Sequence, residues 1–139
     1  MVNFAWEFPA ATPSHRPSPR DSRARITVLG FVSSTGPMAE KSAMALQRVY
    51  DALGSDEHFQ LWAIYPTGNA ASVAAYGRGQ ALTFPLLLDP DRRTAMAYGV
   101  YQTPTFVVIN RHHRVTAVYS GMDDKTAQRL IDTSKGELK

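Results

Sequence analysis

Short apolar runs alternate with amphipathic segments along most of the chain. Residues 26–32 form a run rich in β-branched and aromatic side chains, which is typical of a strand buried on both faces. A helix is predicted to follow to about Leu53, because apolar residues recur there at spacings of three and four. Gly54 is expected to end this helix. Residues 59–65 form the next apolar run and predict a second strand.

The second half of the chain continues this alternation and then changes it. Two short helices are predicted at residues 70–76 and 92–98, with a brief apolar run at 84–88 between them. Two further strands are predicted at residues 105–109 and 115–119, and a last helix at 125–131. Because only a turn separates the two strands, they should form an antiparallel hairpin. Asp123 or Asp124 is expected to cap the last helix.

The order of these elements predicts the fold class. Strands joined through helices run parallel, and the hairpin adds an antiparallel part, so we expect an α/β fold with a mixed sheet between helices. The 139 residues suffice for one domain. We assign residues 26–134 to this domain, residues 1–25 to an N-terminal arm and residues 135–139 to a C-terminal tail.

The N-terminal arm differs from the rest in composition. Four of the nine prolines fall in the first 20 residues, and residues 12–25 carry four arginines and almost no large apolar side chains. This composition is typical of an extended linker. Ahead of it, Phe4, Trp6 and Phe8 alternate as in a short strand with one apolar face. These aromatic residues are candidate contacts, either with their own domain or with a partner.

Composition excludes several kinds of chemistry. The chain contains no cysteine, which rules out disulfides, thiolate metal sites and a cysteine nucleophile. We expect no metal and no cofactor, because His112-His113 lies in a predicted turn without further ligands. The net charge of +3 and the Arg92-Arg93 pair are too weak a signal for nucleic-acid binding. No apolar run reaches the roughly 20 residues that span a bilayer, and no signal peptide is evident, so we expect a cytoplasmic protein.

Two segments could carry chemistry. Residues 33–38 lie between a buried strand and a long helix, where backbone amides and the helix dipole favour an anion. Ser34 or Thr35 could instead simply cap the helix, and a hydroxyl nucleophile would need a base that the neighbouring sequence does not offer. The second segment is residues 102–105, where Pro104 directly precedes a core strand and could be cis.

The motifs together resemble those of the thioredoxin-like fold, in its redoxin branch of thiol–disulfide reductases and peroxiredoxins. The run from Val28 to Glu40 is similar to the active-site segment of that family, in which a strand leads into C-G-P-C and a helix. Further along, F-P-L-L-L-D at residues 84–89, Y-G-V at 98–100 and T-P-T-F-V-V-I-N at 103–110 follow the family's order. The resemblance covers about residues 26–131, and it implies a three-layer sandwich.

The resemblance also implies roles for individual residues. Gly36 and Pro37 match the centre of the motif, but Thr35 and Met38 stand where the family has cysteines. Neither side chain can attack or resolve a disulfide, and Met38 also takes the place of a peroxidatic cysteine. Pro104 matches the family's cis-proline, and Thr103 matches the residue whose backbone pairs with a substrate peptide.

We therefore expect a redox-inactive protein that binds a protein or peptide partner as an adaptor, subunit or chaperone-like module. The expected binding groove comprises Phe31, Ser34, Thr35, Pro37, Met38, Thr103 and Pro104. An alternative is a thiol-independent enzyme that binds glutathione at residues 33–35, and self-association is a further option for the arm. Sequence does not distinguish an adaptor from a domain that only fills space in an assembly.

Overall fold

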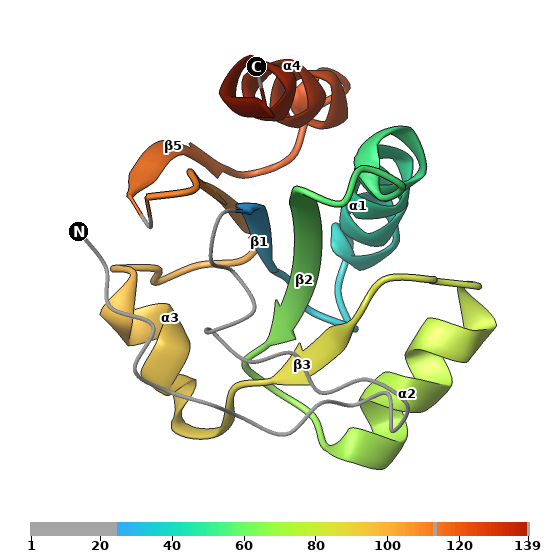
Figure 1. Cartoon of the computed structure of the whole chain (residues 1–139). Helices are drawn as coiled ribbons and strands as arrows, with labels where there is room; N and C mark the ends of the chain where they lie inside the picture. Colours follow the sequence, from blue (N-terminus) through green and yellow to red (C-terminus); the bar gives the residue numbers. More distant parts are fainter. Residues whose placement is uncertain (1–24, 113, 139) are drawn as a thin grey trace.

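A five-stranded sheet in the order β3-β2-β1-β4-β5 forms the centre of the protein (Figure 1). The structure is a computed structural model and describes residues 25–112 and 114–138. The strands are β1 Ile26–Phe31, β2 Phe59–Tyr65, β3 Leu86–Leu88, β4 Thr105–Ile109 and β5 Val115–Ser120. β1, β2 and β3 run parallel. β4 runs antiparallel to both β1 and β5, so the predicted hairpin joins the sheet through its first strand.

Helices cover both faces of this sheet. They are α1 Ala39–Leu53, α2 Ala70–Gly79, α3 Arg93–Ala97 and α4 Thr126–Leu138, and the 3-10 turn η2 Pro90–Arg92 precedes α3. α1, α2 and α4 pack on one face, whereas α3 lies on the other (Figure 1). The α/β sandwich predicted from the sequence is confirmed.

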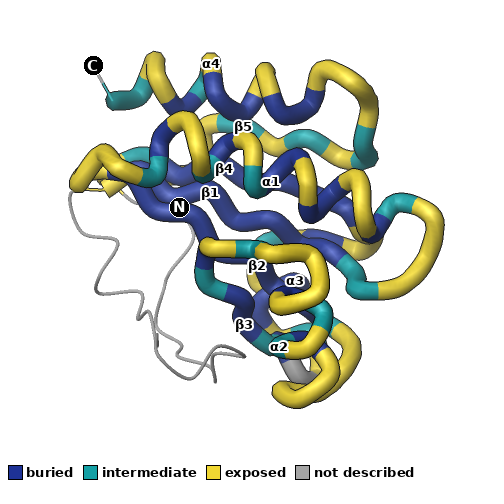
Figure 2. Tube along the Cα trace, turned by 90° about the vertical axis from the view of Figure 1, so that its right-hand side faces the viewer, coloured by how far each residue is buried: buried dark blue, intermediate teal, exposed yellow. Residues whose placement is uncertain are grey.

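The core follows from the alternation of side chains along the strands. In β1, Val28 packs into the cluster beneath α1 and α4, and Leu29 and Phe31 pack into the cluster beneath α3. Every residue of β1, β2 and β4 is buried, as expected for strands covered on both faces. Figure 2 shows these buried strands between helices whose outer positions are exposed.

The predicted helix at residues 92–98 is shorter and is interrupted at its start. Asp91 and Arg92 have φ of 64° and 54°, so η2 and α3 are separate elements. The carboxylate of Asp89 accepts hydrogen bonds from the backbone amides of Thr94 and Ala95, each at 2.8 Å. The Arg92 guanidinium donates to the carbonyl of Val100 at 3.2 Å. These contacts begin α3 later than its sequence pattern indicates.

The chain ends differ from the predicted domain limits in one respect. α4 continues to Leu138, which packs against the core cluster, so residues 135–138 belong to the helix and not to a separate tail. The cause is that the buried face of α4 continues past Ile131 to Ser134. The arm contacts predicted for Phe4, Trp6 and Phe8 lie outside the described residues.

Candidate functional site

Two loops meet at one end of the central strands. β1 and β4 pair antiparallel with Phe31 opposite Thr105, so the segment after β1 lies beside the segment before β4. A cavity of about 210 Å³ lies between them. It is lined by Ser33, Thr35, Gly36, Pro37, Met38, Ala39, Ser42, Thr103 and Pro104. The structure thus brings together the two segments that the sequence singles out.

The first loop is held by its own hydroxyl groups. Ser33 Oγ accepts a hydrogen bond from the Thr35 amide at 3.1 Å and lies 3.3 Å from Thr35 Oγ1. Gly36 has a φ of 95°, a left-handed conformation that glycine adopts without steric cost. The Gly36 carbonyl then accepts from the Ala39 amide at 3.3 Å as the chain enters α1.

The prediction that Ser34 or Thr35 caps α1 is wrong. The N-cap residue is Met38, which makes no side-chain cap hydrogen bond. The helix begins one turn later than the hydroxyl residues, and Ser33 and Thr35 hydrogen-bond to each other within the loop instead. Ser42 Oγ donates to the Met38 carbonyl at 2.7 Å, which joins the first turn of α1 to the cavity wall.

The second loop presents Thr103 and Pro104. The peptide bond between them is cis, the isomer expected from the sequence. Thr103 is exposed and Pro104 is buried. The Pro104 carbonyl accepts a hydrogen bond from the Gly121 amide at 2.8 Å, and Thr105 Oγ1 donates to the Gln102 carbonyl at 2.9 Å. This loop is therefore fixed on both sides of Pro104.

Two predicted groove residues do not line the cavity. Phe31 is fully buried and packs against Tyr98, with ring centroids 5.9 Å apart, because its position in β1 points it to the α3 face. Ser34 is absent from the lining, and its neighbour Ser33 takes that place. Sequence reasoning also missed Ala39 and Ser42, although their spacing of three residues places them on one face of a helix.

The lining permits binding and lacks the groups of acid–base chemistry. Among the described residues, none that lines the cavity has an ionisable side chain, so no base is present to activate a hydroxyl. What the cavity offers is hydroxyl groups, backbone polar groups and the apolar surface of Pro37 and Met38. No three histidine or acidic residues within the described part of the chain are placed to hold a metal ion.

The glutathione alternative depends on the hydroxyls at residues 33–35. Two of these hydroxyls, on Ser33 and Thr35, already lie within hydrogen-bonding distance of each other, and the structure offers nothing further in favour of that reading. Calorimetric titration with glutathione would test it, and a clear affinity would favour the enzyme.

In the part of the chain that the structure describes, no helix is long and apolar enough to cross a bilayer. The cytoplasmic location stays a prediction.

The fold and the paired loops define a thioredoxin-like domain of the redoxin type. The chain belongs to the AhpC/TSA family, whose sequence model matches residues 11–118. It is similar to the thiol-disulfide oxidoreductase ResA of Halalkalibacterium halodurans, with 21% identity over 119 residues, covering 85% of this chain and 67% of that relative.

Solved structures share the same fold. A putative thiol:disulfide interchange protein DsbE from Chlorobium tepidum is 18% identical and superposes with a TM-score of 0.85 over 99% of this chain and 97% of that one. StoA from Bacillus subtilis is 24% identical, with a TM-score of 0.76 over 95% of this chain and 98% of the other. The thioredoxin-like resemblance seen in the sequence is confirmed.

Proposed function

We propose that this chain is a redox-inactive member of its family that binds a protein or peptide partner as an adaptor, subunit or chaperone-like module. One observation carries the proposal. The cavity between the two loops is retained, while Thr35 and Met38 line it at the positions of the family's cysteines, and the chain has no cysteine elsewhere.

Loss of the thiols removes exchange chemistry by a simple argument. Disulfide reduction needs a thiolate to attack and a second thiol to resolve the mixed disulfide. A threonine hydroxyl is a poor nucleophile without a base, and a thioether has no proton to lose. Binding does not depend on these groups, so a groove can remain useful after its chemistry is gone.

The partner that suits this groove is an extended peptide. Thr103 is exposed beside the cavity, and its backbone groups can pair with a peptide as a further strand would. Pro37 and Met38 add apolar surface, and methionine adapts its shape to varied side chains. The proposal therefore rests on backbone pairing with a peptide, supported by apolar contacts.

The test uses the full chain and a phage-displayed library of random dodecapeptides. Peptides enriched on the wild type are synthesised with a fluorescent label, and their Kd is measured by anisotropy. We expect Thr35→Arg and Thr103→Arg to raise Kd about tenfold or more, because each long side chain blocks the cavity and would lose its hydration beneath a bound peptide. Thr67→Arg is the matched control, because Thr67 is an exposed threonine in a loop outside the cavity.

Two results would contradict the proposal. One is the absence of any enriched peptide, and the other is unchanged affinity in both cavity variants while they remain folded by circular dichroism. Insulin reduction and peroxide consumption by the purified wild type are expected at background level. Activity in either assay would show that the protein is not redox-inactive.

A further inference from the structure

A second cavity lies beside the first, between α1 and the loop that leads into α4. Its volume is about 380 Å³. α1 contributes Lys41, Met44 and Arg48, which recur along one helix face, and the loop contributes Met122, Asp123 and Asp124. Two alanines complete the lining. This cavity is larger than the one at the predicted motif, and nothing in the sequence pattern marks it.

The two cavities are joined by the backbone. The Gly121 amide donates to the carbonyl of Pro104 at 2.8 Å. Pro104 lines the first cavity, and Met122, the next residue after Gly121, lines the second. α1 also takes part in both, with Ser42 in the first and Lys41 in the second. The two cavities are therefore lined by residues that are adjacent in the chain or joined by one backbone hydrogen bond.

The second cavity combines apolar side chains with opposite charges on its two walls. Met44 is 61% exposed, and Met122 across from it is half-buried. Large exposed apolar side chains in a cavity rimmed by polar groups are typical of an interaction site. The α1 wall is cationic and the loop wall is anionic, so the cavity complements a segment with charges in a defined order.

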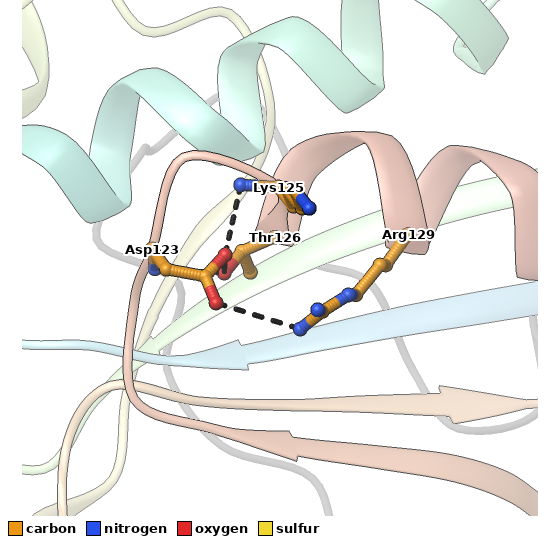
Figure 3. A network of polar contacts seen from close by, with 4 residues as sticks. All are labelled: Asp123, Lys125, Thr126 and Arg129. Carbon is orange, nitrogen blue, oxygen red and sulfur yellow. Dashed lines mark hydrogen bonds and ion pairs between the residues drawn. The ribbon is translucent and has the colours of Figure 1, made fainter.

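Two of the four charged groups in this cavity have no partner among the described residues. Figure 3 shows that Asp123 is engaged: it accepts from the Lys125 amide at 2.8 Å and pairs with Arg129 at 3.5 Å. The Lys125 backbone hydrogen bond, then the Thr126 hydroxyl and the Arg129 charge, lower the pKa of Asp123. Arg48 donates to the Gln128 side chain at 2.9 Å.

Lys41 and Asp124 are both exposed, and their side chains make no hydrogen bond or ion pair with any residue that the structure describes. They are the charges that a partner can pair with at the least cost, because no existing contact has to be broken. Lys41 lies on the α1 wall and Asp124 on the loop wall, so a bound peptide would have its acidic and basic residues in a fixed order.

We propose that this second cavity is a specificity subsite for a partner peptide that presents an apolar side chain between an acidic and a basic residue. The apolar side chain contacts Met44 and Met122, the acidic residue pairs with Lys41, and the basic residue pairs with Asp124. The subsite rests on the proposed function, since it extends the same peptide groove. Charge complementarity of this kind selects partners more than it raises affinity.

The experiment uses the labelled peptides enriched on the wild-type full chain. A double charge swap, Lys41→Glu with Asp124→Lys, keeps the net charge and should raise their Kd about threefold to tenfold. Met44→Gln keeps the side-chain length and removes the apolar contact, and it should also weaken binding. The matched control is the swap Glu57→Lys with Lys135→Glu, because both residues are exposed outside the cavity.

A new selection on the charge-swapped variant should enrich peptides with the acidic and basic residues exchanged. Unchanged affinity in the swap and in Met44→Gln, together with weaker binding by Thr35→Arg, would overturn the subsite and leave the proposed function standing. If the charge swap and Met44→Gln weaken binding while Thr35→Arg does not, the proposed groove is contradicted, and the second cavity binds the peptide by itself and not as a subsite of that groove. A selection that enriches no peptide would overturn both.

Discussion

At the scale of single residues, Gly30 sets how closely α1 approaches the sheet. A methyl group built at Gly30 would lie 2.7 Å and 2.9 Å from the two terminal carbons of Leu46, and Leu46 is fully buried. Only a residue without a side chain allows this packing. The contact matters for the site, because α1 lines both cavities.

We expect Gly30→Ala to destabilise the protein by about 1–3 kcal/mol, because overpacking pushes a fixed core side chain. Gly136→Ala is the matched control, since nothing lies within 4 Å of the added methyl group in α4, and alanine favours helix by up to about 1 kcal/mol. Urea denaturation of both variants measures the two effects. Equal stability in the two variants would contradict the close approach at Gly30.

We expect Asp123 to make the stability depend on pH. Because its pKa is lower in the folded state, its contribution to stability is present above the ordinary aspartate pKa of about 3.9 and is lost as the pH falls through the folded-state pKa. Asp123→Asn should therefore be less stable than the wild type at pH 7, with a difference that shrinks in acid.

Thermal unfolding of the wild type and Asp123→Asn between pH 7 and pH 2.5 tests this dependence. The control is Asp124→Asn, which removes a carboxylate at the same helix end but no hydrogen bond with the described residues. A constant difference between the wild type and Asp123→Asn across the range would mean that Asp123 does not act through its charge.

At the scale of elements, Asp89 fixes the start of α3. Asp89 is 2% exposed, and its carboxylate accepts hydrogen bonds from two backbone amides, each at 2.8 Å. We expect Asp89→Asn to cost about 2–3 kcal/mol, because the amide NH₂ would face a backbone donor and leave it unpaired. Chemical denaturation measures the loss.

The matched control for Asp89 is Asp91→Asn, two residues along the same turn. Asp91 is exposed and has a positive φ that asparagine tolerates, so its effect should stay within about 0.5 kcal/mol. If the two variants lost equal stability, the buried carboxylate would not be the group that holds α3.

The strands were the most predictable elements, for a physical reason. β2 and β4 have the bounds that their apolar runs indicate, because burial on both faces leaves few other arrangements for such runs. Helix starts were less predictable. α1 begins at Ala39, because Ser33 and Thr35 hydrogen-bond to each other in the loop and do not cap the helix. The sequence offers both arrangements, and only the folded structure distinguishes them.

The same distinction applies to the candidate site. The two loops could be named from motifs, and they do meet at a cavity. The direction of Phe31 depends on the pleat of β1, and this put it in the core beside Tyr98. The second cavity joins α1 to residues about 80 positions later, so no local pattern could have revealed it.

At the scale of the molecule, the chain combines a thioredoxin-like fold with the absence of any cysteine. Thr35 is exposed in the loop and Met38 stands at the N-cap of α1, where the helix dipole lowers the pKa of a thiol. We expect the double variant Thr35→Cys with Met38→Cys to catalyse insulin reduction by dithiothreitol, with the wild type at background level.

The single variant Thr35→Cys is the control for this gain. It should form mixed disulfides but turn over slowly, because it has no second thiol to resolve them. A folded double variant that stayed at background would mean that more than the two cysteines separates this chain from the thiol-disulfide oxidoreductase it resembles.

The position of β1 has a consequence for synthesis of the chain. β1 ends at Phe31, but one of its two neighbours is β4, which ends only at Ile109. A nascent chain shorter than this carries an apolar strand with an open hydrogen-bonding edge, the kind of surface that promotes aggregation. Because the pairing is so distant in sequence, closing it should limit the folding rate. Fragments that end before β4 should therefore not fold alone, and the domain is complete only when its last third has been made.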